Sequence, residues 1–159
     1  MSAILKRCRA GFNGGVSRES QVIREARLLK ETTGPDDYGF PVKLNDDGTI
    51  SALAAGDDGT GVFGLLVRPY PAMTYPKPPE DVFHDVMIQG YMTVAVVSGT
   101  VVAKGAVYVR NTAAADHSIG EISADNAAGT VALPNAYFTG PASAGEDGDL
   151  IAEIAYKIY

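Results

Sequence analysis

Alternation of apolar side chains with other residues runs through residues 86–97 and is the clearest pattern in the chain. One face of this segment carries Val86, Ile88, Gly90, Met92, Val94 and Val96. A period of two over this length is typical of a β-strand, and the apolar face is expected to line a core. Residues 150–158 repeat the pattern, with Glu153 and Lys157 on the face expected to be solvated.

Other short apolar runs, cut by Gly, Asp and Pro turns, predict further strands at 40–44, 49–53, 62–68, 106–110, 119–123, 130–133 and 136–139. Short strands at such regular spacing are typical of a sandwich or a barrel. The pattern therefore predicts an all-β fold, a small β-barrel or a jelly-roll or sandwich domain, whose body spans residues 36–159.

Turn residues agree with this prediction. The stretch Asn45-Asp46-Asp47-Gly48 lies between two predicted strands and is expected to form a hairpin connection with Gly at the positive-φ position. Five of the nine prolines fall within residues 69–79. Such a run cannot form a central strand or a helix, so we expect a long surface loop there, a common place for binding elements.

The first 35 residues are expected to form an N-terminal arm. Residues 10–17 are rich in glycine and unsuited to the interior of an element. Residues 20–31 fit either a helix, with Val22, Ala26 and Leu29 on one stripe, or an extended strand. The pattern by itself slightly favours the helix.

The net charge of the chain changes sign near the end of this expected arm. Residues 1–30 contain seven basic and two acidic side chains, a net of +5. The remaining 129 residues contain 6 basic and 17 acidic side chains, a net of −11. A step of this kind suggests an arm that docks on a partner, and the acidic body argues against nucleic-acid binding by the body.

We considered three interpretations of the basic arm: contact with an acidic protein partner, contact with nucleic acid, and a solvated tail without a role. Interleaved apolar residues favour the protein partner, because tails that bind only nucleic acid seldom carry so many aliphatic side chains. The residues expected to contact this partner are Arg7, Arg9, Phe12, Arg18, Arg24, Arg27 and Leu28. We also expect self-association, because Val97, Val101, Val102 and Tyr159 add more apolar surface than one small core can cover.

Composition gives no sign of a membrane span or a disulfide framework. The longest apolar runs are far shorter than the roughly 20 residues that a span needs, and the chain has one cysteine. We therefore expect a soluble protein made in a cytoplasm.

Candidate chemistry is sparse, so no catalytic residue, cofactor or metal site is predicted. His84 and His117 fall in expected loops, and His84 and its neighbour Asp85 would point to opposite sides of an extended chain. The acidic turns before Gly48, Gly59 and Gly148 lack the spacing of a calcium loop. Cys8 between two arginines is interpreted as incidental.

Several soft Gly and hydrophobic motifs follow one another along nearly the whole chain: GFNGGVSR (11–18), YGFPVKL (38–44), DGTI (47–50), GVFGLLVRPY (61–70), GYMTV (90–94), GAVYVR (105–110), IG (119–120), LPNAYFTG (133–140) and GDLIAEI (148–154). In this order the motifs resemble the structural cement, or decoration, proteins of tailed bacteriophage capsids.

This resemblance implies a non-enzymatic virion protein that binds the major capsid protein on the capsid exterior and stabilises the shell, after synthesis in the host cytoplasm. It also implies a β-barrel or jelly-roll domain with an N-terminal extension, and it favours an extended conformation for residues 20–31. The alternative is a β-sandwich module for carbohydrate or host attachment, with Tyr70, Tyr75, Tyr91, Tyr108 and Tyr137 as a stacking surface.

Overall fold

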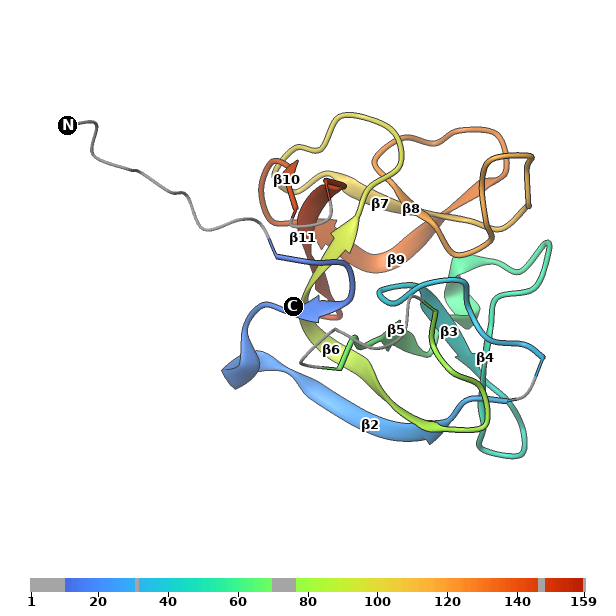
Figure 1. The fold of residues 1–159 in the computed structure, drawn as a ribbon. Helices are drawn as coiled ribbons and strands as arrows, with labels where there is room; N and C mark the ends of the chain where they lie inside the picture. The colour runs from blue at the N-terminus through green and yellow to red at the C-terminus, as the bar shows by residue number, and fades with distance from the viewer. Residues whose placement is uncertain (1–10, 31, 70–76, 146–147, 159) are drawn as a thin grey trace.

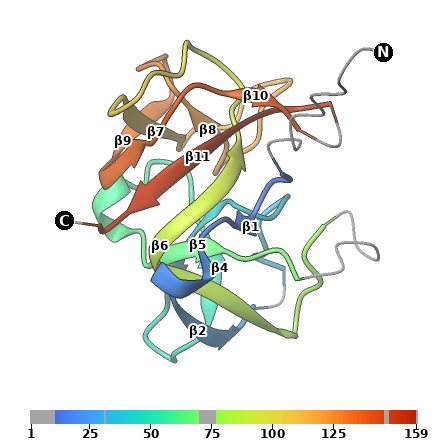
Figure 2. The same ribbon diagram turned by 90° about the vertical axis from the view of Figure 1, so that its left-hand side faces the viewer.

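The fold is organised around one long strand, β6 (Phe83–Ala95), which extends from one group of strands into a second group (Figures 1 and 2). The structure, a computed structural model, describes residues 11–30, 32–69, 77–145 and 148–158. The remaining elements of this part are β1 (Gly15–Val16), η1 (Glu19–Gln21), β2 (Ile23–Leu28), β3 (Pro41–Leu44), β4 (Ile50–Ala52), η2 (Gly59–Gly61), β5 (Gly64–Leu66), β7 (Ala106–Arg110), β8 (Ile122–Ser123), β9 (Thr130–Phe138), β10 (Ser143–Ala144) and β11 (Leu150–Tyr156).

The named strands pair antiparallel throughout, in the order β4-β3-β5-β6-β11-β9-β7-β8. The first half of β6 pairs with β2 and β5, and its second half pairs with β1 and β11. The predicted all-β class is confirmed. Among the described residues this path of strands does not close into a barrel.

Gly90 marks the point in β6 where its partners change. Its neighbour Gln89 pairs with Ile23 of β2, whereas Gly90 itself pairs with Tyr156 of β11. Its φ is +143°, and a Cβ at this position would lie 3.0 Å from the carbonyl oxygen of Gln21. Only glycine allows both this backbone and the close approach of the turn that leads into β2.

Two hydrophobic clusters pack against β6. The larger cluster includes Met87, Met92 and Val94 from this strand and Ile154 and Tyr156 from β11. The smaller cluster is formed by Leu29, Tyr38, Val42, Ile50, Leu66 and Val86. Val86 and Met87 are neighbours in sequence and are both fully buried, so β6 is covered on both of its faces at these two residues.

Most predicted strands are present close to their predicted bounds. The alternating segment forms β6 and the C-terminal segment forms β11. The two predicted strands at 130–133 and 136–139 are one strand, β9, in which Asn135 has a φ of +59°. The Asn45–Gly48 turn is a hairpin between β3 and β4, with Gly48 at a φ of +81°. Residues 70–76 of the predicted proline loop lie outside the described residues.

The helix that the pattern slightly favoured over residues 20–31 is wrong, and the extended alternative is correct. Residues Glu19–Gln21 form one 3₁₀ turn, and Ile23–Leu28 form β2. Of the three residues on the expected helical stripe, Val22, Ala26 and Leu29, only Leu29 is fully buried. Pairing along β6 decides the conformation, since a weak helical preference is readily overridden by tertiary contacts.

Candidate partner-binding surface

The N-terminal residues that the sequence assigned to an arm are, from residue 11 onward, hydrogen-bonded to the body. Gly14 N–H donates to the Thr93 carbonyl at 2.8 Å, and Arg68 N–H donates to the Gly14 carbonyl at 2.8 Å. Further along, β2 pairs with β6, and Leu29 is 0% exposed in the smaller hydrophobic cluster. Residues 11–30 therefore contribute strands and core to the same fold as the body.

Asn13 is the polar anchor of this segment. The residue is 5% exposed, its Oδ1 accepts a hydrogen bond from the Ala95 N–H at 2.9 Å, and its Nδ2 donates to Asp37 Oδ2 at 3.0 Å. Gly14 follows at a φ of +79°, where a Cβ would lie 2.7 Å from the Cβ of Tyr38. The Asn-Gly pair thus fixes the entry of the chain against β6 and the turn before β3.

Arg18 joins the same segment to the outer face of β11. Its Nη2 donates to Glu153 Oε1 at 2.7 Å, and Ser17 and Thr139 also donate to the Glu153 carboxylate. Burial alone would raise the pKa of Glu153, but these hydrogen bonds outweigh it and lower that pKa.

The Arg18 guanidinium also lies 3.9 Å from the centre of the Tyr91 ring. One face of this tyrosine, a member of the suggested sugar-stacking set, is therefore occupied by the chain itself. Tyr70 and Tyr75 of the same set lie outside the described residues.

The other arginines predicted to contact a partner also have carboxylates of their own chain beside them. Arg24 pairs with Glu19 and lies 3.8 Å from Asp85. Arg27 pairs with Glu25 at 2.6 Å. These pairs are partly exposed, so each contributes little to stability, but together they neutralise much of the positive charge of β2.

The predicted contact residues that the structure describes have different neighbours. Phe12 and Arg24 line the same cleft, whereas Arg18 lies with Glu153 and Arg27 lies near Phe63. Leu28 is half-buried at the end of β2. Arg7 and Arg9 lie outside the described residues.

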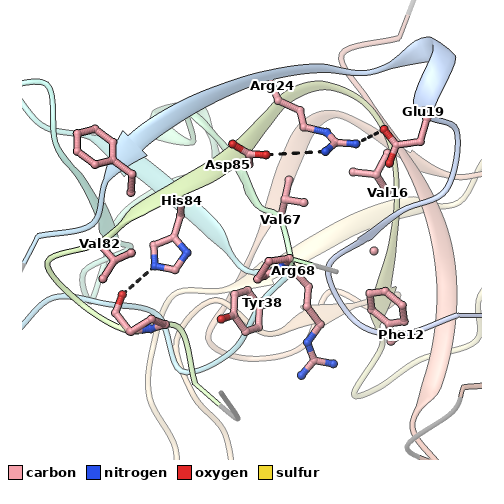
Figure 3. Close-up of a pocket in the computed structure, with 14 residues that line it drawn as sticks. Phe12, Val16, Glu19, Arg24, Tyr38, Val67, Arg68, Val82, His84 and Asp85 are labelled. Carbon is pink, nitrogen blue, oxygen red and sulfur yellow. Dashed lines mark hydrogen bonds and ion pairs between the residues drawn. The ribbon is translucent and has the colours of Figure 1, made fainter. Parts of the chain in front are cut away.

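The cleft has a volume of about 720 Å³ and was not foreseen from the sequence (Figure 3). It lies between the start of β6, the segment around Phe12 and the chain that leaves β5, and Figure 3 shows Tyr38 and Arg68 opposite Asp85 and Arg24. The Arg68 guanidinium is 5.9 Å from the Phe12 ring centre and 5.3 Å from that of Tyr38. These residues are distant in sequence. Phe12 and Arg24 were expected to contact a partner, but nothing in the sequence placed them beside His84 and Asp85.

Both histidines are hydrogen-bonded to nearby groups of the chain. His84, expected in a solvated loop, is in β6, is 7% exposed and has Nε2 2.8 Å from the Pro79 carbonyl oxygen. His117 has Nδ1 2.8 Å from Glu121 Oε2. Both rings are thus held by local hydrogen bonds to groups of the surrounding loops.

The acidic turn before Gly59 serves the fold locally, whereas Glu146 and Asp147 of the turn before Gly148 lie outside the described residues. Hydrogen bonds from Thr60 and Gly61 lower the pKa of Asp58, which caps the turn η2. Within the described ranges, no group of three or more His, Cys, Asp or Glu side chains is placed to hold a metal ion. The same part of the chain contains no helix long and apolar enough to cross a membrane.

Comparisons with known proteins agree with one another on architecture. The sequence model of one family, described as structural cement protein (E217 gp24/Pam3 gp6), matches residues 4–156. Among solved structures, a chain of "The capsid of Myoviridae Phage XM1" matches with a TM-score of 0.69 at 20% identity. That match covers 96% of this chain and 94% of the other, so the two share a fold over nearly their full lengths. A comparison with curated proteins gave no match.

Proposed function

The chain belongs to the structural cement protein family, whose members are non-enzymatic, and from this premise we propose that it stabilises a bacteriophage capsid by binding the major capsid protein on the outer surface of the shell. The single observation that carries the proposal is the family match over residues 4–156. The all-β fold shared with a chain of a phage capsid structure is consistent with it.

Stabilisation follows from mass action. A protein that binds the assembled shell and not its dissociated subunits lowers the free energy of the shell at every site that it occupies. Because a shell presents many identical sites, modest contacts at each site add up. Particles with the protein should therefore survive heating or low salt to a greater extent than particles without it, and equal survival of both would contradict a cementing role.

Binding on the outside can be tested by adding the purified protein to assembled, genome-filled particles that lack it. A protein that binds the exterior will attach to these closed particles and restore their thermal stability. Attachment only when the protein is present during assembly would contradict an exterior site. Both experiments use the full chain, so neither depends on a fragment folding alone.

The proposal assigns the electrostatic part of shell binding mainly to Lys6, Arg7 and Arg9. In support, Arg18, Arg24 and Arg27 already have carboxylates of their own chain beside them. Without these three cations the rest of the chain has a net charge of −9. Phe12 and Leu28 are the apolar members of the proposed contact, and their contribution should persist in high salt.

A salt series separates a protein partner from nucleic acid. The triple substitution of Lys6, Arg7 and Arg9 by Gln should weaken shell binding at low salt and have less effect at high salt, because exposed charges are screened beyond about 8–10 Å. Lys104→Gln, a change at an exposed lysine of the body, is the matched control. Binding of the intact chain to DNA in preference to empty shells, lost in the triple variant, would contradict the assignment.

We also propose that copies of the chain associate with one another. The exposure of apolar side chains beyond the two core clusters supports this, since Val97 is 42% exposed and Val102 is 55% exposed. Val101 of the same predicted set is 6% exposed and belongs to the larger cluster, and Tyr159 lies outside the described residues.

A further inference from the structure

Two neighbouring apolar side chains project from the start of β6 without cover. Phe83 is 69% exposed and Val82 is 45% exposed. Phe83 is the most exposed of the large apolar side chains in the described part of the chain. An aromatic residue left in water to this extent is a frequent mark of a contact surface, because aromatic side chains contribute much of the energy of protein interfaces.

The same two residues form part of the rim of the 720 Å³ cleft. The other apolar lining comes from Phe12, Val16, Tyr38, Val67, Pro69 and Pro79. A cavity of about 150 Å³ is enough to hold a benzene ring, so this cleft has room for a phenylalanine side chain and its neighbours. A projecting apolar pair and a receptive apolar hollow therefore lie side by side on one surface.

Charge points to the identity of the occupant. The cleft is lined by two carboxylates, Glu19 and Asp85, and by two guanidinium groups, Arg24 and Arg68, so its formal charge is zero with histidine neutral. The whole chain has a net charge of −6. Two copies of an acidic protein repel each other over most of their surfaces. They can approach most easily where the surface is locally neutral and carries both positive and negative side chains.

We infer that the cleft is a self-association surface, in which Phe83 of each copy enters the cleft of a second copy of this chain about a two-fold axis. A two-fold contact uses the same surface on both copies, so it requires a surface that contains both the projection and the hollow. The rim position of Phe83 and Val82 meets this requirement. Arg24 of one copy would then face Glu19 or Asp85 of the other across the axis.

The contact is expected to be weak in free solution. One buried aromatic side chain and its neighbours on each copy cover far less than the roughly 1,200–2,000 Å² of a standard stable interface. On a shell, neighbouring copies are held at high effective concentration, which favours the same contact. This inference rests on the self-association part of the proposed function. Because Phe12 lines the cleft and is also a member of the proposed shell contact, the experiments below measure self-association and shell attachment separately.

Phe83→Trp provides a direct probe, because the chain contains no tryptophan. In the full-length protein the introduced indole should emit as a solvent-exposed group at low concentration. It should shift to shorter wavelength as concentration rises, in parallel with dimer formation in sedimentation velocity. A short-wavelength emission that does not depend on concentration would mean that the chain covers the position itself and would overturn the inference.

Phe83→Asp tests the energetics, with Leu44→Asp as the matched control at another exposed apolar residue, one that lies outside both the cleft and the Val97 and Val102 set. The first change should weaken self-association at least tenfold, and the second should leave it unchanged. Equal effects of the two variants, or a wild-type chain that stays monomeric at millimolar concentration, would overturn the inference. A shift of the Phe83→Trp emission on shells so sparsely occupied that copies are not neighbours would also overturn it, because the cleft would then face the capsid protein.

Shell attachment is measured separately with Phe83→Asp, at protein concentrations where the wild type is monomeric and occupies shells too sparsely for bound copies to be neighbours. Retained attachment together with lost self-association confirms that the two surfaces are distinct. Loss of both would overturn the inference as stated, because the same surface would then serve the shell. Failure of the wild-type chain to attach to shells bears on the proposed function alone.

Discussion

Asn13→Ala is the sharpest test of whether residues 11–30 belong to the folded body. The change removes two side-chain hydrogen bonds, one from the Ala95 N–H and one to Asp37, at a residue that is only 5% exposed. A net hydrogen bond contributes about 1 kcal/mol, and a buried donor left without an acceptor costs about 1–3 kcal/mol. We therefore expect a loss of about 2–4 kcal/mol in the free energy of unfolding.

The assay is equilibrium unfolding in urea together with thermal unfolding. For a chain of this size, 1 kcal/mol corresponds to a shift of about 2–4 °C in Tm, so Asn13→Ala should lower Tm by about 5–15 °C. Asn126→Ala, at an exposed asparagine, is the matched control and should stay within about 0.5 kcal/mol of wild type. A stability of Asn13→Ala within that same margin would refute the reasoning, because residues 11–30 would then be dispensable to the fold.

Two further predictions concern β6 and the Glu153 site. Gly90→Val should destabilise the protein by more than about 2 kcal/mol, because a side chain there would meet the Gln21 carbonyl oxygen at a φ of +143°. Gly61→Ala is the control and should be close to neutral, because no atom lies within 4 Å of a Cβ at that position. Chemical denaturation of both variants measures the change in the free energy of unfolding. The lowered pKa of Glu153 means that its contribution to stability is present above the pKa of an unfolded glutamate, about 4.3, and is lost as pH falls through its folded value. Stability measured from pH 7 to pH 3 should therefore fall less steeply in Glu153→Gln than in wild type, and identical slopes would contradict the role of the Arg18 pair.

The sequence was most informative where a strand has one buried face. Alternation located β6 and β11, and the turn residues before Gly48 located the β3–β4 hairpin, because both signals depend only on neighbouring residues. It was misleading at β2, where the strand conformation depends on hydrogen bonds to β6, a segment about sixty residues away. A local pattern contains no information about such a partner.

The candidate site was harder to predict than the fold, for a similar reason. The sequence showed that residues 1–30 are basic, but not that Arg18 and Arg24 lie beside carboxylates of distant or neighbouring segments. Phe83 lay just before the alternating segment and carried no motif, so its exposure became visible only in three dimensions. The cleft beside it is formed by four separate stretches of chain, and no spacing in the sequence could have indicated it.

Because β6 contributes to both hydrophobic clusters, we expect the two clusters to unfold together and not one at a time. Disrupting either cluster exposes Val86 or Met87 and removes one side of the strand on which the other cluster depends. The backbone amides of β6 should therefore exchange with solvent only through whole-molecule opening, as the slowest group in a hydrogen-exchange experiment. A force applied to one end of this strand would therefore act on both hydrophobic clusters.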